Sequence, residues 1–226
     1  ENVSKLKEFQ EHYDKYQTDT RTIAPEVYRD FSKTEEFSEA DYYDVERHTQ
    51  VYERIEALKK DGAYTKDNPL VIWNPYGTNA HSVYVYFVTE KPVKVSYRIS
   101  VQEDGIPTFS ERCRGISEYS TEHEYLLIGL SAEQSNRVSV VLEDEEGNSG
   151  VRTFYVQAGE RYGIAKEKLD VAKGVSGENP SEGLFAHFGN TTGSREAIQL
   201  YDNNGILRSE FPVLQGSAKR LLFFDN

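Results

Sequence analysis

Residues 92–101, PVKVSYRISV, decide the fold, because apolar and polar side chains alternate along them without a break. Val93, Val95, Tyr97, Ile99 and Val101 are separated by lysine, serine or arginine. A period of two predicts a β-strand with one buried face and one solvated face. Strands of this kind build two-layer β-sandwiches.

Similar runs flank this stretch between residues 63 and 158 and are separated by turn-rich pieces such as NPYGTN and EDEEGNSG. Short strands at this spacing predict an immunoglobulin- or fibronectin-like β-sandwich, although the Cys and Trp spacing of antibody domains is absent. The remaining predicted strands are LVIWN (70–74), HSVYVYFV (81–88), EHEYLLIGL (122–130), RVSVVLED (137–144) and VRTFYVQA (151–158).

Residues 1–62 have a helical period instead. Apolar side chains recur at three- and four-residue steps. They are Leu6, Phe9, Tyr13 and Tyr16 in a first run, and His48, Val51, Tyr52, Ile55 and Leu58 in a second. Ser38 with Asp41 resembles a capping box, and Gly62 is a helix stop. We therefore expect an N-terminal helical segment over residues 1–62.

The last third of the chain changes character again. Residues 159–182 lose the alternation and predict a linker. Residues 183–226 hold four short apolar runs, GLFAHFG, AIQLYD, GILRSEFPV and KRLLFFD. Asn204-Gly205 suits a type I′ hairpin turn, which needs positive φ at both central residues. These runs predict the first strands of a β-propeller that is incomplete in this chain.

Composition excludes several classes of protein. The chain has 226 residues and a net charge of −12, with no basic stripe for nucleic acid. The longest apolar run is far shorter than the roughly 18 residues that span a bilayer, and the first residues do not have the charged-apolar-small pattern of a signal peptide. The absence of methionine suggests a processed or truncated product, or modified methionines omitted from the sequence. The single cysteine excludes a disulfide framework.

The residues that carry chemistry elsewhere form no recognised site here. None of the five histidines has a ligand spacing such as HExxH, and no phosphate loop, nucleophile elbow or dinucleotide fingerprint is present. Cys113 and His123 lack the signature of a nucleophile and its base. The acidic run 143–146 fits a hairpin turn better than a calcium loop. We assign no catalytic, cofactor-binding or metal residue and expect no cofactor. The histidines are His12, His48, His81, His123 and His187.

Three smaller features have structural interpretations. In the NPYGTN turn, Pro75 presets φ, Gly77 permits positive φ, and Asn74 and Asn79 cap local backbone. Trp73, the only tryptophan, is predicted to anchor a core or a domain interface. Acceptor triplets for N-glycosylation begin at residues 2 and 190, but such triplets are common.

The stretch NPLVIWNPYGTNAHSVYVYFVTEKPVKVSYRIS, residues 68–100, resembles the N-terminal domain of bacterial aryl-sulfate sulfotransferases. In that family an NPYG-N turn joins the first two strands and an F-T-KPV-V-Y segment follows. EHEYLLIGL and NRVSVVLEDEEGN are similar to later strands of the domain. GLFAHFGN and LYDNNGILR are similar to the entry into the family's propeller. The resemblance covers about 150 residues, and residues 1–62 are matched least.

The resemblance implies a specific reaction. Enzymes of this family move a sulfuryl group from an aryl sulfate ester to a phenol, without a nucleotide donor. Their six-bladed propeller supplies a histidine nucleophile that is transiently sulfated, with further histidines and an arginine holding the sulfate oxygens. None of these residues maps onto this sequence, so we expect the 226-residue chain alone to be inactive. The sandwich is implied to pack beside the propeller and to pair two subunits, outside the cytoplasm.

Two alternatives remain open from sequence. The chain could be a non-enzymatic surface adhesin or carbohydrate-binding module, with a helical stalk, one sandwich and an exposed aromatic patch. The parent could also be a sulfatase, in which water replaces the phenol as acceptor.

Overall fold

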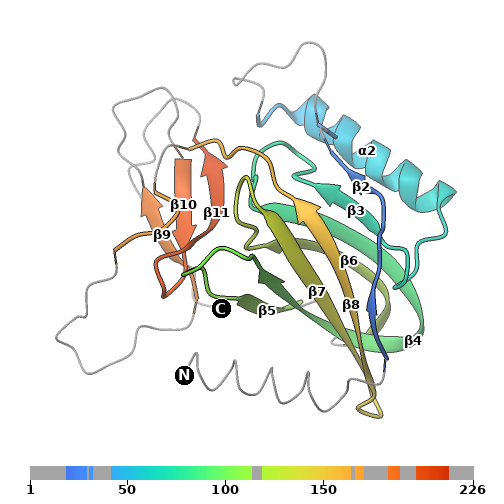
Figure 1. Ribbon diagram of the computed structural model, residues 1–226. Helices are drawn as coiled ribbons and strands as arrows, with labels where there is room; N and C mark the ends of the chain where they lie inside the picture. The colour runs from blue at the N-terminus through green and yellow to red at the C-terminus, as the bar shows by residue number, and fades with distance from the viewer. Residues whose placement is uncertain are drawn as a thin grey trace.

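The computed structural model describes residues 19–29, 31–32, 42–113, 119–163, 166–170, 183–188 and 197–213. They form a curled β-sheet with one helix against it and a smaller sheet beside it (Figure 1). The elements in chain order are β1 (Thr20–Thr22), β2 (Val27–Tyr28), α2 (Val45–Asp61), β3 (Leu70–Trp73), β4 (Ser82–Ser100), β5 (Phe109–Cys113), β6 (Ser120–Ile128), β7 (Ser135–Asp144), β8 (Ser149–Gln157), β9 (Phe185–Phe188), β10 (Ala197–Tyr201) and β11 (Leu207–Pro212).

Strand β4 is 19 residues long and belongs to both layers of the sandwich. Its first part, to Val88, pairs with β3 and β6, and its second part, from Val93, pairs with β5 and β7. Pro92 lies between the two parts, where the register with β6 also shifts. A proline has no N–H to donate to a neighbouring strand. A long strand therefore tolerates proline at a position such as this, between its two paired parts. The two strands expected at 81–88 and 92–101 are therefore one strand.

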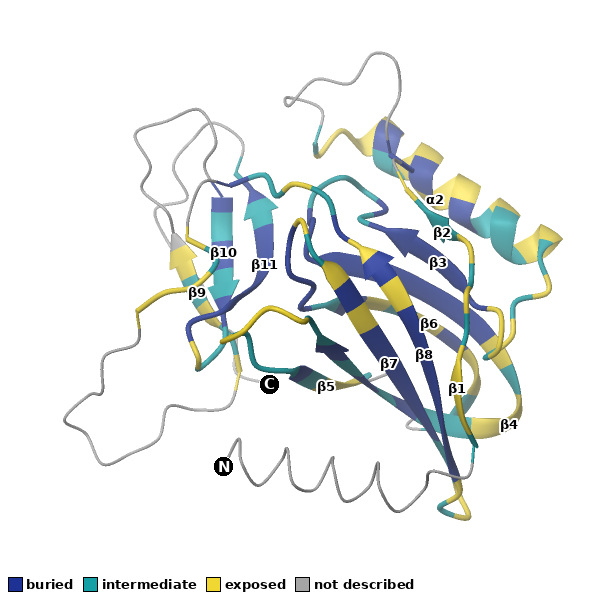
Figure 2. Cartoon of the chain, viewed as in Figure 1, coloured by how far each residue is buried: buried dark blue, intermediate teal, exposed yellow. Residues whose placement is uncertain are grey.

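The hydrophobic core lies between the layers. The alternation that predicted it is confirmed, since Val95, Tyr97 and Ile99 are all buried. Phe87 of the first layer and Phe154 of the second belong to the same core cluster. Figure 2 shows β7 and β8 as almost continuous bands of buried residues. A mainly β fold is thus confirmed, in which one curled sheet encloses the core between its two halves.

Helix α2 covers the outer face of β3 and β4 through Val51 and Ile55. It begins after Asp44, whose side chain accepts a hydrogen bond from the Arg47 backbone N–H at 2.8 Å. An N-cap of this kind satisfies one of the free amides of the first turn. Gly62 ends the helix, as predicted. The capping box expected at residues 38–41 and the first apolar run, residues 6–16, lie outside the described residues.

The expectation of helix over residues 1–62 is wrong for residues 20–28. Thr20–Thr22 pairs in parallel with Val151–Thr153 of β8, and Val27–Tyr28 pairs in parallel with β3. Both strands complete edges of the sandwich. The β-branched and aromatic residues of TRTIAPEVY favour this extended backbone, and Pro25 is unfavourable inside a helix.

The small C-terminal sheet has the order β11-β10-β9, with antiparallel pairing throughout. Part of the expected linker is built into it. The N–H of Leu207 donates to the Glu167 carbonyl, and the N–H of Leu169 donates to the Gly205 carbonyl, both at 2.8 Å. Residues 167–169 therefore run along the free edge of β11. The fourth predicted run, residues 219–225, lies outside the described residues.

The β10–β11 hairpin forms where it was predicted, but its turn differs from type I′. Gly205 has φ 72°, whereas Asn204 is not among the residues with positive φ. The Asp202 carboxylate accepts the N–H groups of Asn204 at 2.8 Å and Ile206 at 3.0 Å. These bonds from the Asp202 side chain stabilise a three-residue loop with Gly205 in the left-handed conformation. The sequence DNNG is compatible with this loop as well as with the predicted type I′ turn.

Candidate functional site

The NPYGTN turn joins β3 to β4 and lies at the end of the sandwich that faces the C-terminal sheet. The N–H of Gly77 donates to the Asn74 carbonyl at 3.0 Å, and the Asn79 N–H donates to the Asn74 side chain at 2.9 Å. Gly77 has φ 74°, and Asn74 also has positive φ. The predicted structural roles of this glycine and this asparagine are confirmed. Trp73 is a core residue, as expected, and its Nε1 donates to the Ala80 carbonyl at 3.0 Å.

Replacing Gly77 with alanine is expected to lower the free energy of unfolding by about 1–3 kcal/mol, because an L side chain is strained at positive φ. An added Cβ would also lie 2.7 Å from the Ser32 hydroxyl and 3.3 Å from the Arg47 guanidinium. Urea unfolding followed by circular dichroism measures the loss. Gly105→Ala is the control for φ alone, since only the flexible end of Lys168 approaches its position. Equal losses for both variants would contradict a contribution from packing.

Asn79 joins this turn to β11, a role that the sequence did not reveal. Its side-chain amide donates to the Ser209 hydroxyl at 2.7 Å. Its side-chain oxygen accepts the backbone N–H of His81 at 3.1 Å and lies 3.5 Å from the backbone N–H of Glu210. Asn79 is 3% exposed, so these bonds are shielded from water. One amide group therefore ties the sandwich to the C-terminal sheet. We call this region the junction. It comprises Asn79, His81, Arg208 and Glu210 with their contacts between the sandwich and the C-terminal sheet.

Arg208 is the largest polar side chain of the junction and is 1% exposed. It donates to the Asp202 carboxylate at 2.7 Å and to the Pro107 carbonyl at 2.8 Å. Its guanidinium also lies 5.1 Å from the centre of the Phe109 ring. Burial lowers the pKa of Arg208, and the carboxylate of Asp202 opposes this. A planar guanidinium has several N–H donors, so it can hydrogen-bond to a carboxylate and to a carbonyl from another part of the chain at the same time.

Glu210 is a second fully buried charged residue on the same strand. One carboxylate oxygen accepts the Gly163 N–H at 3.0 Å, and the other has no hydrogen-bond partner among the described residues. Burial raises the pKa of Glu210, and the backbone N–H of Gly163 works against that shift. Arg161 lowers it as well, and Nη1 of Arg161 is likewise buried without a partner in the described parts of the chain.

His81 lies beside β11 and is fully buried. Its Nδ1 is 2.7 Å from the Leu130 carbonyl, which only accepts, so Nδ1 carries the hydrogen. Nε2 therefore holds a lone pair, and it has no partner among the residues that the structure describes. Burial lowers the pKa of His81 to about 4, and the positive charges of Arg161 and Arg208 contribute.

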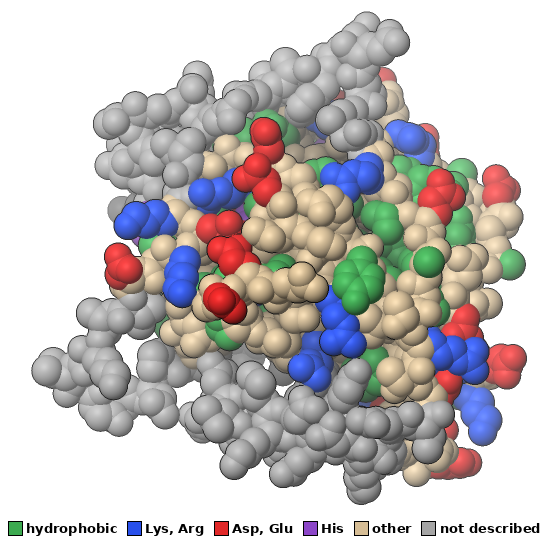
Figure 3. All heavy atoms as spheres, in the orientation of Figure 1, with side chains coloured by type: hydrophobic (Ala, Val, Ile, Leu, Met, Phe, Trp, Pro, Cys, Tyr) green, Lys and Arg blue, Asp and Glu red, His purple; other side chains and the backbone are tan. Residues whose placement is uncertain are grey.

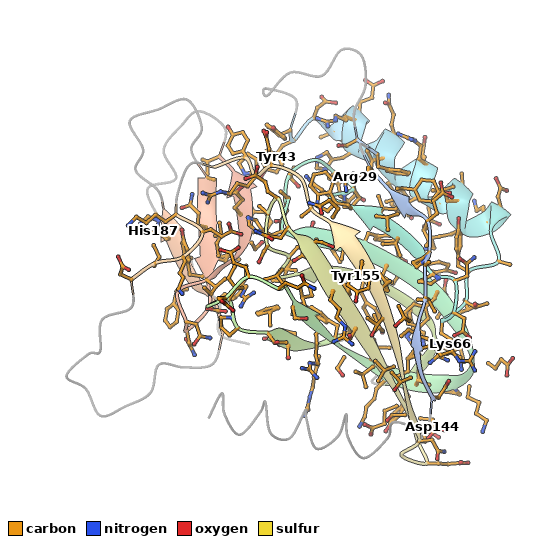
Figure 4. All side chains as sticks on the ribbon, in the orientation of Figure 1. Arg29, Tyr43, Lys66, Asp144, Tyr155 and His187 are labelled. Atoms are coloured by element: carbon orange, nitrogen blue, oxygen red, sulfur yellow. The ribbon has the colours of Figure 1, made fainter. Side chains whose placement is uncertain are left out.

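His48 and His187 make none of the contacts that define the junction, although His187 lies in the same row of the small sheet as Glu210. The His48 ring lies 5.0 Å from the Tyr76 ring in a tilted arrangement, and its Nε2 lies 2.7 Å from the Tyr42 carbonyl. His187 is exposed on β9, with Nδ1 3.2 Å from the Gln199 side chain. Figure 4 shows it on the outer side of the small sheet. His12 falls outside the described residues.

Cys113 and His123 do not form a nucleophile and base. The ring nitrogens of His123 lie 3.1 Å from the Thr89 hydroxyl and 3.1 Å from the Tyr125 hydroxyl. Burial lowers the pKa of His123 to about 4 and raises the pKa of Cys113 to about 12. A thiol that stays protonated at neutral pH is a poor nucleophile.

The acidic run forms a solvated turn at the far end of β7, where Figure 4 labels Asp144. The Asp144 carboxylate accepts two bonds from Asn148, from its backbone and its side chain, and one from the Glu146 N–H at 3.0 Å. These bonds, led by the Asn148 side chain, hold the pKa of Asp144 below its ordinary value. Among the described residues, no group of three or more His, Cys, Asp or Glu side chains is placed to bind a metal ion.

Sequence reasoning missed the junction because its partners are far apart in the chain. Asn79 and Ser209 are 130 positions apart, and Arg208 and the Pro107 carbonyl are 101 apart. One local signal was available. The short strand LRSEFP carries an arginine and a glutamate between apolar residues, and charged residues in such a strand are buried only when they are paired.

Comparison with known families matches residues 70–159 to the arylsulfotransferase Ig-like domain. This segment runs from the start of β3 to just beyond β8, so it includes the NPYGTN turn and both halves of β4. No curated protein and no solved structure matches the chain. Within the described residues, no helix has the length and apolar character needed to cross a membrane.

Proposed function

Because residues 70–159 belong to the arylsulfotransferase Ig-like domain family, we propose that this chain is the N-terminal part of an aryl-sulfate sulfotransferase. The parent enzyme moves a sulfuryl group from an aryl sulfate ester to a phenolic acceptor through a sulfated histidine. The family match is the observation that carries this proposal. The chain itself supplies packing and lacks the catalytic residues, which belong to a propeller that continues after it.

The C-terminal sheet is the start of that propeller in this proposal. Strands β9, β10 and β11 are antiparallel, and residues 167–169 add a fourth edge, which supports a four-stranded blade. Ile198, Leu200 and Phe211 share one face of the sheet and are only half-buried. A blade with an apolar face needs a neighbouring blade to cover it.

The test is release of nitrophenol from nitrophenyl sulfate, with and without phenol. We expect turnover from a longer product of the same reading frame and none from the 226-residue chain. Stimulation by phenol identifies a transferase, whereas the same rate without phenol identifies a sulfatase. His187→Gln in the longer protein is a control, and its full activity is expected because His187 is outside the catalytic set of this proposal. Turnover by the 226-residue chain would contradict the proposal.

We further propose that the sandwich helps to pair two subunits outside the cytoplasm. Leu126 on the edge strand β6 is 50% exposed, and Val88 on the neighbouring β4 is 42% exposed. These apolar side chains support a contact surface at this edge. Sedimentation equilibrium of the wild-type chain and of Leu126→Lys tests the pairing. We expect a dimer that the lysine dissociates. A monomer in both would contradict it.

A second candidate function is carbohydrate binding without catalysis. It is favoured by two exposed tyrosines, Tyr43 just before α2 at 41% exposure and Tyr52 in the middle of the helix at 55%. Figure 3 shows no single-sign cluster of charges on the face in view, where lysines and arginines mix with carboxylates. Glycan-array binding that is lost in Tyr52→Ala would favour this candidate. Absence of turnover in the longer protein would favour it further.

A further inference from the structure

We propose that acid releases the C-terminal sheet from the sandwich, and that protonation of His81 drives the release. The proposal concerns the junction alone and does not depend on the enzymatic activity of the parent protein. It rests on the position of His81 between two backbone contacts to β11.

The first of these contacts is through Gly129. The N–H of Gly129 is shared between the His81 carbonyl at 3.0 Å and the Arg208 carbonyl at 2.9 Å. The second is through Asn79. Its side-chain oxygen accepts a hydrogen bond from the His81 N–H and lies 3.5 Å from the backbone nitrogen of Glu210. The backbone of His81 is therefore held against β11 on both sides. A change at its ring acts directly on the docking surface.

The ring of His81 has no place for a second proton. Nδ1 already donates to the Leu130 carbonyl, and Nε2 faces no acceptor among the described residues. An imidazolium here is a buried cation with no counter-ion among the described residues, and the positive charges of Arg161 and Arg208 disfavour it further. Such a charge is strongly unfavourable in a dry environment. Undocking of β11 exposes the ring to water and moves Arg208 away, so the protonated state favours the undocked form.

Other titrating groups at the junction act in the opposite direction. Burial raises the pKa of Glu210 on β11 and of Glu167 in the segment beside it. Both carboxyl groups therefore take up a proton more readily in the docked form, and acid strengthens docking through them. An arginine side chain is protonated at these pH values, and Arg208 donates to the Asp202 carboxylate at 2.7 Å. Among these groups, His81 is the one whose protonation weakens docking.

The sign and the pH range follow from the pKa of His81. Its pKa is about 4 in the docked form, against an ordinary value of 6.5. A depressed pKa contributes stability that is complete above pH 6.5 and is lost as the pH falls toward 4. For this one group, lowering the pH from 7.5 to 5 shifts the docking equilibrium about 30-fold toward release.

Hydrogen–deuterium exchange of the 226-residue chain tests the proposal, with rates corrected for the intrinsic effect of pH. His81 alone is expected to lower the protection of residues 197–213 by about 30-fold between pH 7.5 and 5. Protonation of Glu167 and Glu210 strengthens docking and makes the observed loss of protection smaller than this. Residues 135–157 of β7 and β8 keep their protection, because the sandwich stays folded. A simultaneous loss in both regions would mean global unfolding and would overturn the proposal.

His81→Gln removes the titration and keeps an amide donor for the Leu130 carbonyl. In this variant the protection of residues 197–213 is expected to stay constant or to rise in acid. His123→Gln is the matched control, since His123 is also buried with a lowered pKa, and among the described residues its ring contacts Phe87, Thr89 and Tyr125 of the sandwich. It keeps the acid-dependent loss at residues 197–213. A loss in His81→Gln equal to that of the wild-type chain would overturn the proposal.

A direct titration of the wild-type chain tests the proposal even if the His81→Gln variant fails to fold. The imidazole signals of the wild-type chain, followed by NMR, are expected to give His81 a pKa near 4 while β11 is docked. A value near 6.5 for His81 in the folded chain would remove the driving force and overturn the proposal.

Discussion

Phe154→Ala lowers the free energy of unfolding by about 3–5 kcal/mol, the usual cost of truncating a buried phenylalanine. Phe154 is 1% exposed on β8 and belongs to the core cluster that both layers share. The cavity left by its ring cannot collapse easily, because the backbone on both sides is fixed by sheet hydrogen bonds. For a chain of this length, the melting temperature falls by roughly 6–20 °C.

The control for this substitution is its neighbour. Tyr155 is 55% exposed. As the next residue along β8 it lies on the opposite face of the strand, and Figure 4 labels its side chain. Tyr155→Ala is expected to change the free energy of unfolding by less than about 0.5 kcal/mol. Thermal and urea unfolding of the two variants side by side give the comparison. Equal losses at both positions would show that the inner face of β8 is not the core.

Arg208→Met is expected to cost about 3–5 kcal/mol, because it removes one partner of a buried ion pair. Asp202, whose side chain is 12% exposed, loses its counter-ion, and the Pro107 carbonyl loses a donor. The effect is local. Amide protection is expected to fall at residues 197–213 and to persist in β7 and β8.

Arg137→Met serves as the matched control, because Arg137 is an exposed arginine on β7. It should leave both regions unchanged. Arg208→Lys should recover only part of the loss, since one ammonium cannot reproduce the fork of donors that reaches Asp202 and Pro107 together. A full recovery by lysine would show that charge alone, without that geometry, holds the sheet in place.

What the sequence predicted well was local. The alternation of Val95, Tyr97 and Ile99 predicted a strand and its buried face, because a period of two is a property of neighbouring residues. Gly62 predicted the end of a helix for the same reason. The NPYGTN turn was also predicted, since the backbone at Gly77 depends on the residues around it.

What the sequence did not predict depends on pairing at a distance. Three residues of β1 carry too little pattern to be seen, yet they pair with Val151–Thr153, 131 positions later in the chain. Residues 81–88 and 92–101 were predicted as two strands, whereas the backbone continues through both as one strand. The two charged residues of the junction, Arg208 and Glu210, were not predicted as a pair of buried contacts, because Pro107 and Gly163 come from other parts of the fold. A single sequence gives no direct sign of such contacts.

The passage of β4 through both layers has a consequence for how the domain folds. Each layer contains one half of β4 as a central strand. When one layer forms, it therefore also positions the half of β4 that belongs to the other layer. We therefore expect the sandwich to unfold in a single cooperative transition, with coincident loss of secondary structure and of Trp73 fluorescence. A force applied across the domain would be carried by covalent backbone from one layer to the other.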